Sequence, residues 1–325
     1  MDEKLKITIL EQLRVLDENY IPLVSYPIID GDKKIFLGEK EKRTCRFCGR
    51  SKADGVTFKK EAHALSNLIG NNSLFSYYEC DECNQRFSIY EGDFAEFMKI
   101  YHCILKVKGK RGIPSYRMNT SRVDIEGTTT AIKQFEGDPT LQCNIDEVNK
   151  KLTITALRTY TPIHVYKALL KMALTILPKE DLEHCMSALK FLNKEPVSVK
   201  IPLPVVIQMY GQGADVHHSI MGAIFKRREN AKGMVFSYVF LLAYNNMCFQ
   251  MPIFGSDLDK FAKGESVRFH TIPTFPLLDG YPLILDKLVD LASSEKKVKE
   301  PISLSFTFAD FERTDYDPET GEELP

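Results

Sequence analysis

The chain has 325 residues, a formal net charge of −1, 44% hydrophobic residues and 27% charged residues. This length suggests two domains or one large domain with a module, and the near-neutral charge excludes a uniformly basic coat for nucleic acid. The most apolar run, residues 234–254, is interrupted by Asn245, Asn246 and Gln250. We therefore expect two strands joined by a turn rather than a membrane span. No cleavable signal is visible in the first twenty residues, so we expect a cytoplasmic protein.

The predicted N-terminal domain covers residues 1–123. It begins with a helix in the first twenty residues, where apolar residues recur at helical spacing, and continues with short strands at 21–30 and 33–39. Residues 41–123 contain paired cysteines and two basic clusters. Residues 124–150 are polar and contain EGTTT and EGDPT, which read as turns, so we interpret this stretch as a linker.

The predicted C-terminal domain covers residues 151–325. After a strand at 151–160, helical periodicity runs from Thr161-Pro162 to Pro178, and a second helix is expected at 180–192. Strands separated by turn residues then dominate, apart from a helical segment near 283–291. This meander predicts an α+β domain whose sheet is mostly antiparallel, with helices on one side. The predicted strands after the helices are 197–210, 217–227, 234–244, 246–254, 266–272 and 302–308.

The last sixteen residues carry seven acidic residues and one Arg. We interpret this stretch as a solvated tail. The alternative is an acidic strip that shields a basic surface of the same chain.

Four of the eight cysteines form two Cys-x-x-Cys pairs, Cys45 with Cys48 and Cys80 with Cys83. Each spacing lets both sulfurs of a tight turn reach one ion, and Gly49 suits the first turn. In a reducing compartment such pairs are better read as metal ligands than as disulfides. They predict a structural Zn²⁺ with four thiolate ligands and no open position for chemistry. The alternative, four reduced buried cysteines, does not account for two matched spacings.

The interval between the pairs is thirty-one residues, longer than the roughly 15–20 of a plain zinc ribbon. It contains His63, and Asn84 directly follows the last cysteine. The succession CRFC, EAHALSN, GNN and ECDECNQRF resembles the HNH endonucleases, the zinc-stapled branch of the ββα-metal nucleases, over about residues 43–97. The resemblance implies a β-hairpin and a helix that hold one divalent ion and one scissile phosphate. It also makes a role in restriction or phage defence an expectation.

The resemblance assigns roles to matching residues. His63 becomes the general base, because a neutral imidazole can take a proton from water near neutral pH. Asn84 becomes an oxygen ligand or orienting group for a catalytic Mg²⁺ or Mn²⁺. The family often has a metal ligand directly before the base, where this chain has Ala62. Glu61 is the natural substitute, because residues two apart on a strand share a face.

Two other features of the motif leave alternatives open. A middle Asn is expected shortly before the second cysteine pair, where Ser76 and Tyr77 lie. Asn71 and Asn72 are farther upstream, and either can act as the middle Asn only if the loop folds back. Glu91, seven residues after the final Asn of the motif, lies on the same helix face and is either a further ligand or an ordinary solvated residue.

Two basic clusters accompany these motifs. One surrounds the first cysteine pair, and the other, residues 106–122, contains no acidic residue and is interrupted by glycines and Tyr116. A flexible basic loop suits a phosphate backbone, so we predict contacts to DNA without base specificity. The alternative is an ordinary solvated loop. The predicted nucleic-acid-binding residues are Arg46, Arg50, Lys106, Lys108, Lys110 and Arg111.

The main hypothesis is a metal-dependent endonuclease that hydrolyses DNA phosphodiester bonds. The C-terminal domain would dock DNA, form a homodimer or sense a signal. The alternative is a catalytically decayed, zinc-stabilised module that binds DNA or RNA, which Ala62 and the unassigned middle Asn favour. A third hypothesis is a structural protein in which zinc only joins two domains.

Overall fold

The structure is a computed structural model. Among its described helices, none is long and apolar enough to cross a membrane. The predicted strand at 266–272 lies outside the described residues apart from Phe269 and Ile272, and so does the tail from residue 318 onward. The described residues are 3–29, 31–109, 112–127, 129–134, 138–194, 205–211, 219–232, 235–255, 269, 272, 283–315 and 317.

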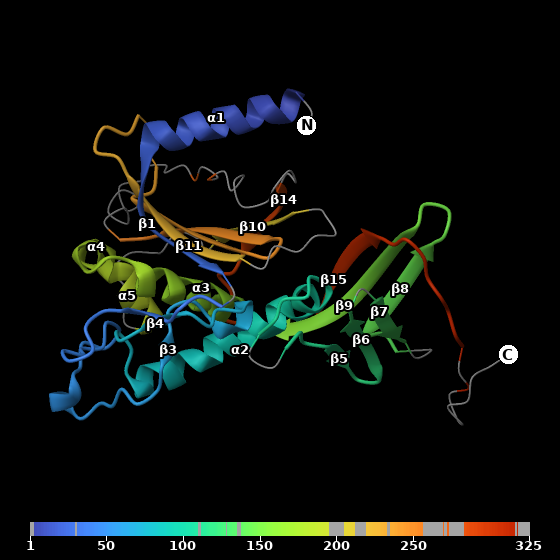
Figure 1. Cartoon of the computed structure of the whole chain (residues 1–325), viewed down its shortest axis with the longest axis horizontal. Coiled ribbons are helices and arrows are strands. Elements are labelled where there is room, and N and C mark those ends of the chain that lie inside the picture. Colours follow the sequence, from blue (N-terminus) through green and yellow to red (C-terminus); the bar gives the residue numbers. More distant parts are fainter. Residues whose placement is uncertain are drawn as a thin grey trace.

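A six-stranded sheet is the centre of the fold (Figure 1). Its strand order is β1-β11-β12-β13-β10-β14, and every neighbouring pair is antiparallel. The mostly antiparallel sheet is therefore confirmed, but its first edge strand comes from the N-terminal part of the chain, so the sheet combines both predicted domains. The strands are β1 (Tyr20–Ile29), β10 (Val205–Gly211), β11 (Ser219–Arg227), β12 (Tyr238–Tyr244), β13 (Met247–Ile253) and β14 (Leu283–Asp290).

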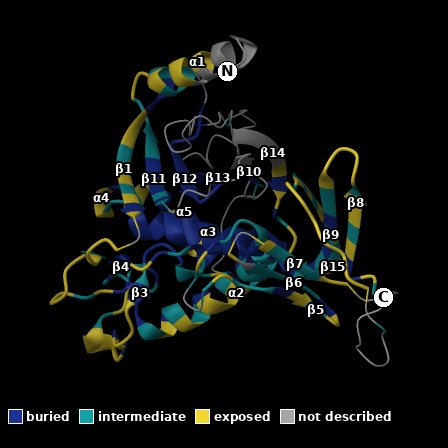
Figure 2. Cartoon of the chain, turned by 45° about the vertical axis from the view of Figure 1, so that its right-hand side comes forward, coloured by how far each residue is buried: buried dark blue, intermediate teal, exposed yellow. Residues whose placement is uncertain are grey.

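Helix α3 (Pro162–Ile176) packs against one face of this sheet, and helix α1 (Glu3–Asn19), whose Leu10 and Leu13 are exposed, leads directly into the edge strand β1 (Figure 1). Figure 2 shows the buried residues concentrated between the sheet and α3. Every residue of β12 and β13 is buried, and Asn245 in the turn between them adopts a left-handed φ of 45°. The long apolar run is therefore a buried hairpin, as predicted.

The helices after residue 160 follow the sequence signals in part. Helix α3 begins with Pro162 in its first turn and ends before Pro178, as predicted. The predicted helix at 180–192 is instead broken into α4 (Lys179–Leu182), a 3-10 turn and α5 (Met186–Leu192). The break lies where the chain at Gly255 presses on it: a Cβ built there would be 1.8 Å from the His184 carbonyl oxygen.

Residues 283–290 are a strand, although their apolar spacing predicted a helix. They form β14, which pairs with β10 at the edge of the large sheet. Short apolar runs fit either element, and here pairing with an available strand edge supplies the backbone hydrogen bonds.

Two three-stranded sheets lie on the opposite side of the molecule from α1 and β1 (Figure 1). The predicted linker at 124–150 contributes strands to both sheets, so it is not a linker. This segment forms short strands whose outer faces stay polar. The turn within it is stabilised by Asp138, whose carboxylate accepts hydrogen bonds from the hydroxyls of Ser121 and Thr140, both at 2.7 Å. The strands are β5 (Tyr116–Met118), β6 (Ser121–Glu126) and β7 (Thr129–Lys133) in one sheet, and β8 (Leu141–Asp146), β9 (Lys151–Tyr160) and β15 (Lys297–Thr307) in the other.

The segment with the cysteine pairs forms a third small sheet and a long helix beneath α3. The sheet has the order β2-β4-β3, in which β3 and β4 are antiparallel, and the helix follows directly. The elements are β2 (Ile35–Leu37), β3 (Ala62–His63), β4 (Leu74–Ser76) and α2 (Asp81–Ile104).

Candidate metal centre and active site

The four paired cysteines converge. Their sulfur atoms all lie within 4.8 Å of one another, and the Cys48 and Cys80 sulfurs are 3.8 Å apart. A tetrahedral zinc with Zn–S bonds of about 2.3 Å places its sulfurs roughly 3.8 Å apart, so the four cysteines fit this ion. Within the described part of the chain, no other group of three or more His, Cys, Asp or Glu residues brings its ligand atoms together.

The local backbone explains this convergence. The Gly49 amide donates to the Cys45 carbonyl at 2.8 Å, and Gly49 has a φ of +72°, which closes the first knuckle as predicted. Cys80 is the N-cap residue of α2, and Cys83 lies in the first turn of that helix. The first pair is thus placed by a tight turn and the second by a helix start.

The thiols also show why a cation fits. A hydrogen bond with Cys83 is the main reason that the pKa of Cys45 falls to about 5, whereas burial raises the pKa of Cys80 to about 11. The same contact with Cys45 raises the pKa of Cys83. Deprotonating one sulfur therefore opposes deprotonation of its neighbours, and four thiolates at this spacing need a positive ion between them.

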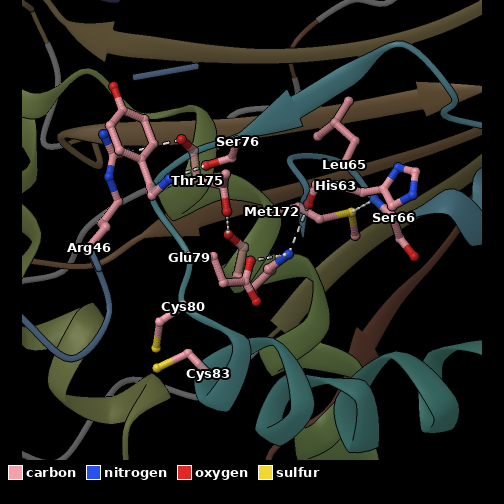
Figure 3. A network of polar contacts seen from close by, with 12 residues as sticks. Arg46, His63, Leu65, Ser66, Ser76, Glu79, Cys80, Cys83, Met172 and Thr175 are labelled. Carbon is pink, nitrogen blue, oxygen red and sulfur yellow. Dashed lines mark hydrogen bonds and ion pairs between the residues drawn. The ribbon is translucent and has the colours of Figure 1, made fainter. Parts of the chain in front are cut away.

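Arg46, predicted to bind nucleic acid, has an internal role (Figure 3). Its guanidinium donates to the carbonyls of Leu174 at 2.6 Å, Thr175 at 3.0 Å and Leu177 at 2.6 Å. It also lies 3.8 Å from the ring centre of Tyr78. A cation at the C-terminal end of a helix satisfies its last carbonyls and its dipole, so Arg46 joins the knuckle to α3.

His63 lies on β3, opposite Phe75 of β4. Its ring is half-buried and tilted against the Phe75 ring, with the centroids 4.6 Å apart. The start of α2 is fixed to the residues that lead into this strand, because the Asp81 carboxylate accepts hydrogen bonds from the amides of Lys59 at 3.0 Å and Lys60 at 2.9 Å. Hairpin and helix are therefore held together close to His63.

Glu61 directly precedes β3, and its side chain is linked to His63 through Lys34 and Phe75. Its carboxylate is 2.8 Å from the Lys34 ammonium, which in turn lies 4.8 Å over the Phe75 ring that contacts His63. Both charged side chains are more than half exposed. The Glu61 carboxylate is thus already paired with an ammonium.

The loop between β3 and β4 folds back through Asn71. The side chain of Asn71 is completely buried. Its amide nitrogen donates to the carbonyls of Leu65 at 2.6 Å and Leu74 at 2.8 Å, and its oxygen accepts from the amides of Ser73 at 3.2 Å and Leu74 at 2.9 Å. Asn71, rather than Ser76, therefore organises this loop, and the buried Asn in GNN was its sequence signal.

Sequence reasoning missed a buried ion pair that supports His63 (Figure 3). Lys171 of α3 lies 2.9 Å from the carboxylate of Glu79 and donates to the backbone carbonyl of His63 at 3.0 Å. Although burial opposes its charge, the carboxylates of Glu79 and Glu91 raise the pKa of Lys171. The His63 ring points away from this pair in Figure 3. No local pattern could have matched Lys171 to residues about a hundred positions earlier.

The other predicted ligands lie elsewhere on α2. Asn84 is half-buried in the first turn, and its side chain forms no hydrogen bond with Glu61, His63 or any other described residue. Glu91 is near enough to Glu79 and Lys171 to shift the pKa values of both. Glu91 therefore lies near Lys171, whose ammonium also donates to the His63 backbone carbonyl. Asn84 has no such connection to His63 among the described residues.

The basic loop passes beside the loop that follows His63. A Cβ built on Gly70, whose φ is +94°, would lie 3.1 Å from the Lys108 carbonyl oxygen, and the Lys108 side chain is exposed. Lys106 donates to the carbonyl of Gly127 at 3.0 Å. Arg50 is exposed and pairs with Glu82. Lys110 and Arg111, predicted to bind nucleic acid, lie outside the described residues.

No protein-family model, curated protein or solved structure matches the chain. The functional interpretation therefore depends on the residues and the geometry described above.

Proposed function

We propose that the protein is a metal-dependent endonuclease that hydrolyses DNA phosphodiester bonds, with a structural zinc at the four cysteines. The observation that carries this proposal is the position of His63. Its backbone is fixed by Lys171, its loop is fixed by Asn71, and its imidazole contacts Phe75, over which lies the ammonium of Lys34 that pairs with the exposed Glu61 carboxylate. A rigidly held imidazole next to a cation-binding carboxylate suits general-base catalysis on a phosphate.

His63 would accept a proton from the attacking water. Glu61 would hold the catalytic ion together with the phosphate, because Mg²⁺ is usually bound by one or two carboxylates and substrate oxygens. When bound, Mg²⁺ or Mn²⁺ stabilises the negative charge on the phosphate and the leaving oxygen. Lys34 would exchange its contact with Glu61 for one with the phosphate. The ligand roles of Asn84 and Glu91 stay predictions.

The proposal that DNA binds to this chain depends on the charge and position of exposed basic residues. The exposed Lys108 lies on the loop next to Gly70, close to the loop that follows β3, and Arg50 lies on the first cysteine knuckle. Contacts of this kind neutralise phosphates and weaken with salt, and they carry no base specificity. A homodimer and a role in restriction or phage defence also stay predictions.

The test is nicking of supercoiled plasmid by the full chain in Mg²⁺, in Mn²⁺ and in EDTA. We expect cleavage with either divalent ion, none in EDTA, and loss of cleavage in His63→Ala. His184→Ala, which changes an exposed histidine of the 3-10 turn, is the matched control and should cleave like the wild type.

The second candidate function is a nucleic-acid-binding module without catalysis. The Lys34–Glu61 pair favours it, because an ammonium already neutralises the proposed metal ligand. Salt-sensitive binding of DNA by the wild type without cleavage in either ion would establish this function and exclude the nuclease.

A further inference from the structure

Lys167 of α3 is a mostly buried lysine without an anionic partner among the described residues. It has 6% of its surface exposed, and its ammonium lies 4.7 Å from the ring centre of Phe191 and 5.5 Å from that of Tyr90. Among the described residues, none accepts a hydrogen bond from it or forms an ion pair with it. Lys171, one turn later on the same helix, has only 2% of its surface exposed and pairs with Glu79. An unpaired buried charge is strongly unfavourable, so Lys167 requires an explanation.

The charged groups that act on Lys167 have the same sign. Burial first, and then the charges of Lys194 and Arg86, lower the pKa of Lys167 to about 8. The nearby acid, Asp93, is already hydrogen-bonded to the His164 ring at 2.6 Å. The cluster therefore combines three cations and no free carboxylate within the part of the chain that the structure describes.

Two more donors of the same region are buried without an acceptor among the described residues. They are the Arg86 Nε–H and the Tyr90 hydroxyl. Arg86 and Tyr90 are four residues apart on α2 and so lie on one face of that helix. The Arg86 guanidinium is held in place by its bond to the Asn193 side-chain oxygen at 2.7 Å. A positioned guanidinium, an ammonium and a hydroxyl are the donors that a phosphoryl group accepts.

We propose that Arg86, Tyr90 and Lys167 form a binding site for one small phosphate-class anion where α2, α3 and α5 meet, with Lys194 at its rim. The burial of Lys167 excludes a nucleic-acid backbone and limits the ligand to a single anionic group. The site adjoins the cysteine cluster, because Arg86 also donates to the Cys83 sulfur at 3.6 Å, but it does not include His63 and does not depend on the proposed nuclease function.

The test is titration calorimetry of the full, zinc-loaded chain with inorganic phosphate, without divalent ions, at an ionic strength matched with chloride. Lys167→Met removes the charge but keeps the length of the side chain. Lys190→Met, an exposed lysine of α5, is the matched control. We expect Lys167→Met to weaken phosphate binding by about tenfold to a hundredfold, as expected for losing a hydrogen bond from a charged donor, and Lys190→Met to bind like the wild type.

The melting temperature in chloride gives a second readout. An unpaired buried ammonium predicts that Lys167→Met melts no lower than the wild type. Two results would overturn the proposal. One is the absence of phosphate binding by the wild type. The other is a lower melting temperature in both Lys167→Met and Glu195→Gln, which would give Lys167 an acceptor within this chain, since Glu195 lies outside the described residues.

Discussion

The four cysteines and the His63 side of the hairpin differ in how far the fold brings metal-binding side chains together. The cysteine sulfurs converge within 4.8 Å, and three of the four residues are buried. The half-buried His63 ring lies against the buried Phe75 ring, the exposed carboxylate of Glu61 pairs with Lys34, and no comparable ligand cluster forms among the described residues. The first region is assembled by the fold itself, and the second, in the proposed function, would leave ligand positions for water and substrate.

Under the proposed function, this difference follows from what each ion would do. A structural zinc contributes folding free energy through a closed set of ligands, so its site must be complete. A catalytic Mg²⁺ keeps several waters and shares its ligands with substrate phosphate, so its site must stay open. The rigid part of the second region is therefore the backbone support of His63 rather than the ligand set.

The largest expected effect is on the closed region. Cys80→Ser removes one thiolate, and zinc sites of this type contribute about 10 kcal/mol or more to folding in small fingers. We expect less than about a tenth of the wild-type zinc content and loss of the folded finger, measured by elemental analysis and circular dichroism. Cys143→Ser, at a half-buried cysteine of β8, is the control and should keep its zinc. Full zinc content in Cys80→Ser would contradict the four-thiolate site.

The next effect is on the support of the open region. Lys171→Met leaves the Glu79 carboxylate buried without its partner, which should lower the free energy of unfolding by about 3–5 kcal/mol. Urea denaturation measures this change. Adding Glu79→Leu should recover most of the loss, because the buried charge is then gone. A double variant as unstable as the single one would show that the pair is not the source of the effect.

A smaller loss is expected in the loop that carries His63 back to β4. Asn71→Ala removes four hydrogen bonds inside a fully buried site and should cost about 2–4 kcal/mol. Zinc content should not change. Asn72→Ala, at the adjacent exposed amide, should cost less than about 1 kcal/mol. Equal effects of the two substitutions would refute the organising role of Asn71.

Glu300 forms an ion pair outside both regions, and its expected contribution to the free energy of unfolding is a reference for the values above. Although partial burial opposes its charge, hydrogen bonds from Lys297 and Tyr160 and the charge of Arg158 lower the pKa of Glu300 to about 2. A lowered carboxyl pKa stabilises the fold above the unfolded value near 4.5, and this contribution is lost as the pH falls towards 2. After allowance for solvent screening, Glu300→Gln should cost about 1–2 kcal/mol at pH 7 and little at pH 2.5. An equal cost at both pH values would contradict this ionisation.

The smallest effect on stability is expected at Lys34. The Lys34–Glu61 pair is exposed, so Lys34→Met should change the free energy of unfolding by less than about 0.5 kcal/mol. It frees the Glu61 carboxylate, so the Mg²⁺ concentration for half-maximal cleavage should fall. An increase in that concentration would indicate that Glu61 does not hold the catalytic ion.

The sequence predicted the features that depend on local spacing. The cysteine pairs, the knuckle glycine, the boundaries of α3 and the buried hairpin of β12 and β13 all follow from signals within a few residues. The roles that depend on distant partners could not be predicted. Arg46 looked like a surface cation until α3 supplied its carbonyls, and nothing near Glu79 indicates Lys171.

The same reason explains the errors in the fold. The run at 283–290 fits a helix or a strand equally well, and only the free edge of β10 decides between them. The polar segment at 124–150 resembles a linker because its short strands bury only one face. The spacing of Asn71 suggested a position too far upstream for the motif unless the loop folds back, and the bond from Asn71 to the Leu65 carbonyl, which the sequence does not reveal, folds it back.

The most direct test of the central claim is a paired measurement on His63→Ala, namely its zinc content and its single-turnover rate of DNA cleavage in Mg²⁺, both from one preparation. The separation of the two regions predicts one zinc per chain, an unchanged melting temperature and a cleavage rate reduced about 10²- to 10⁴-fold, as expected for loss of a general base. A wild-type cleavage rate, or a loss of cleavage accompanied by loss of zinc, would contradict it.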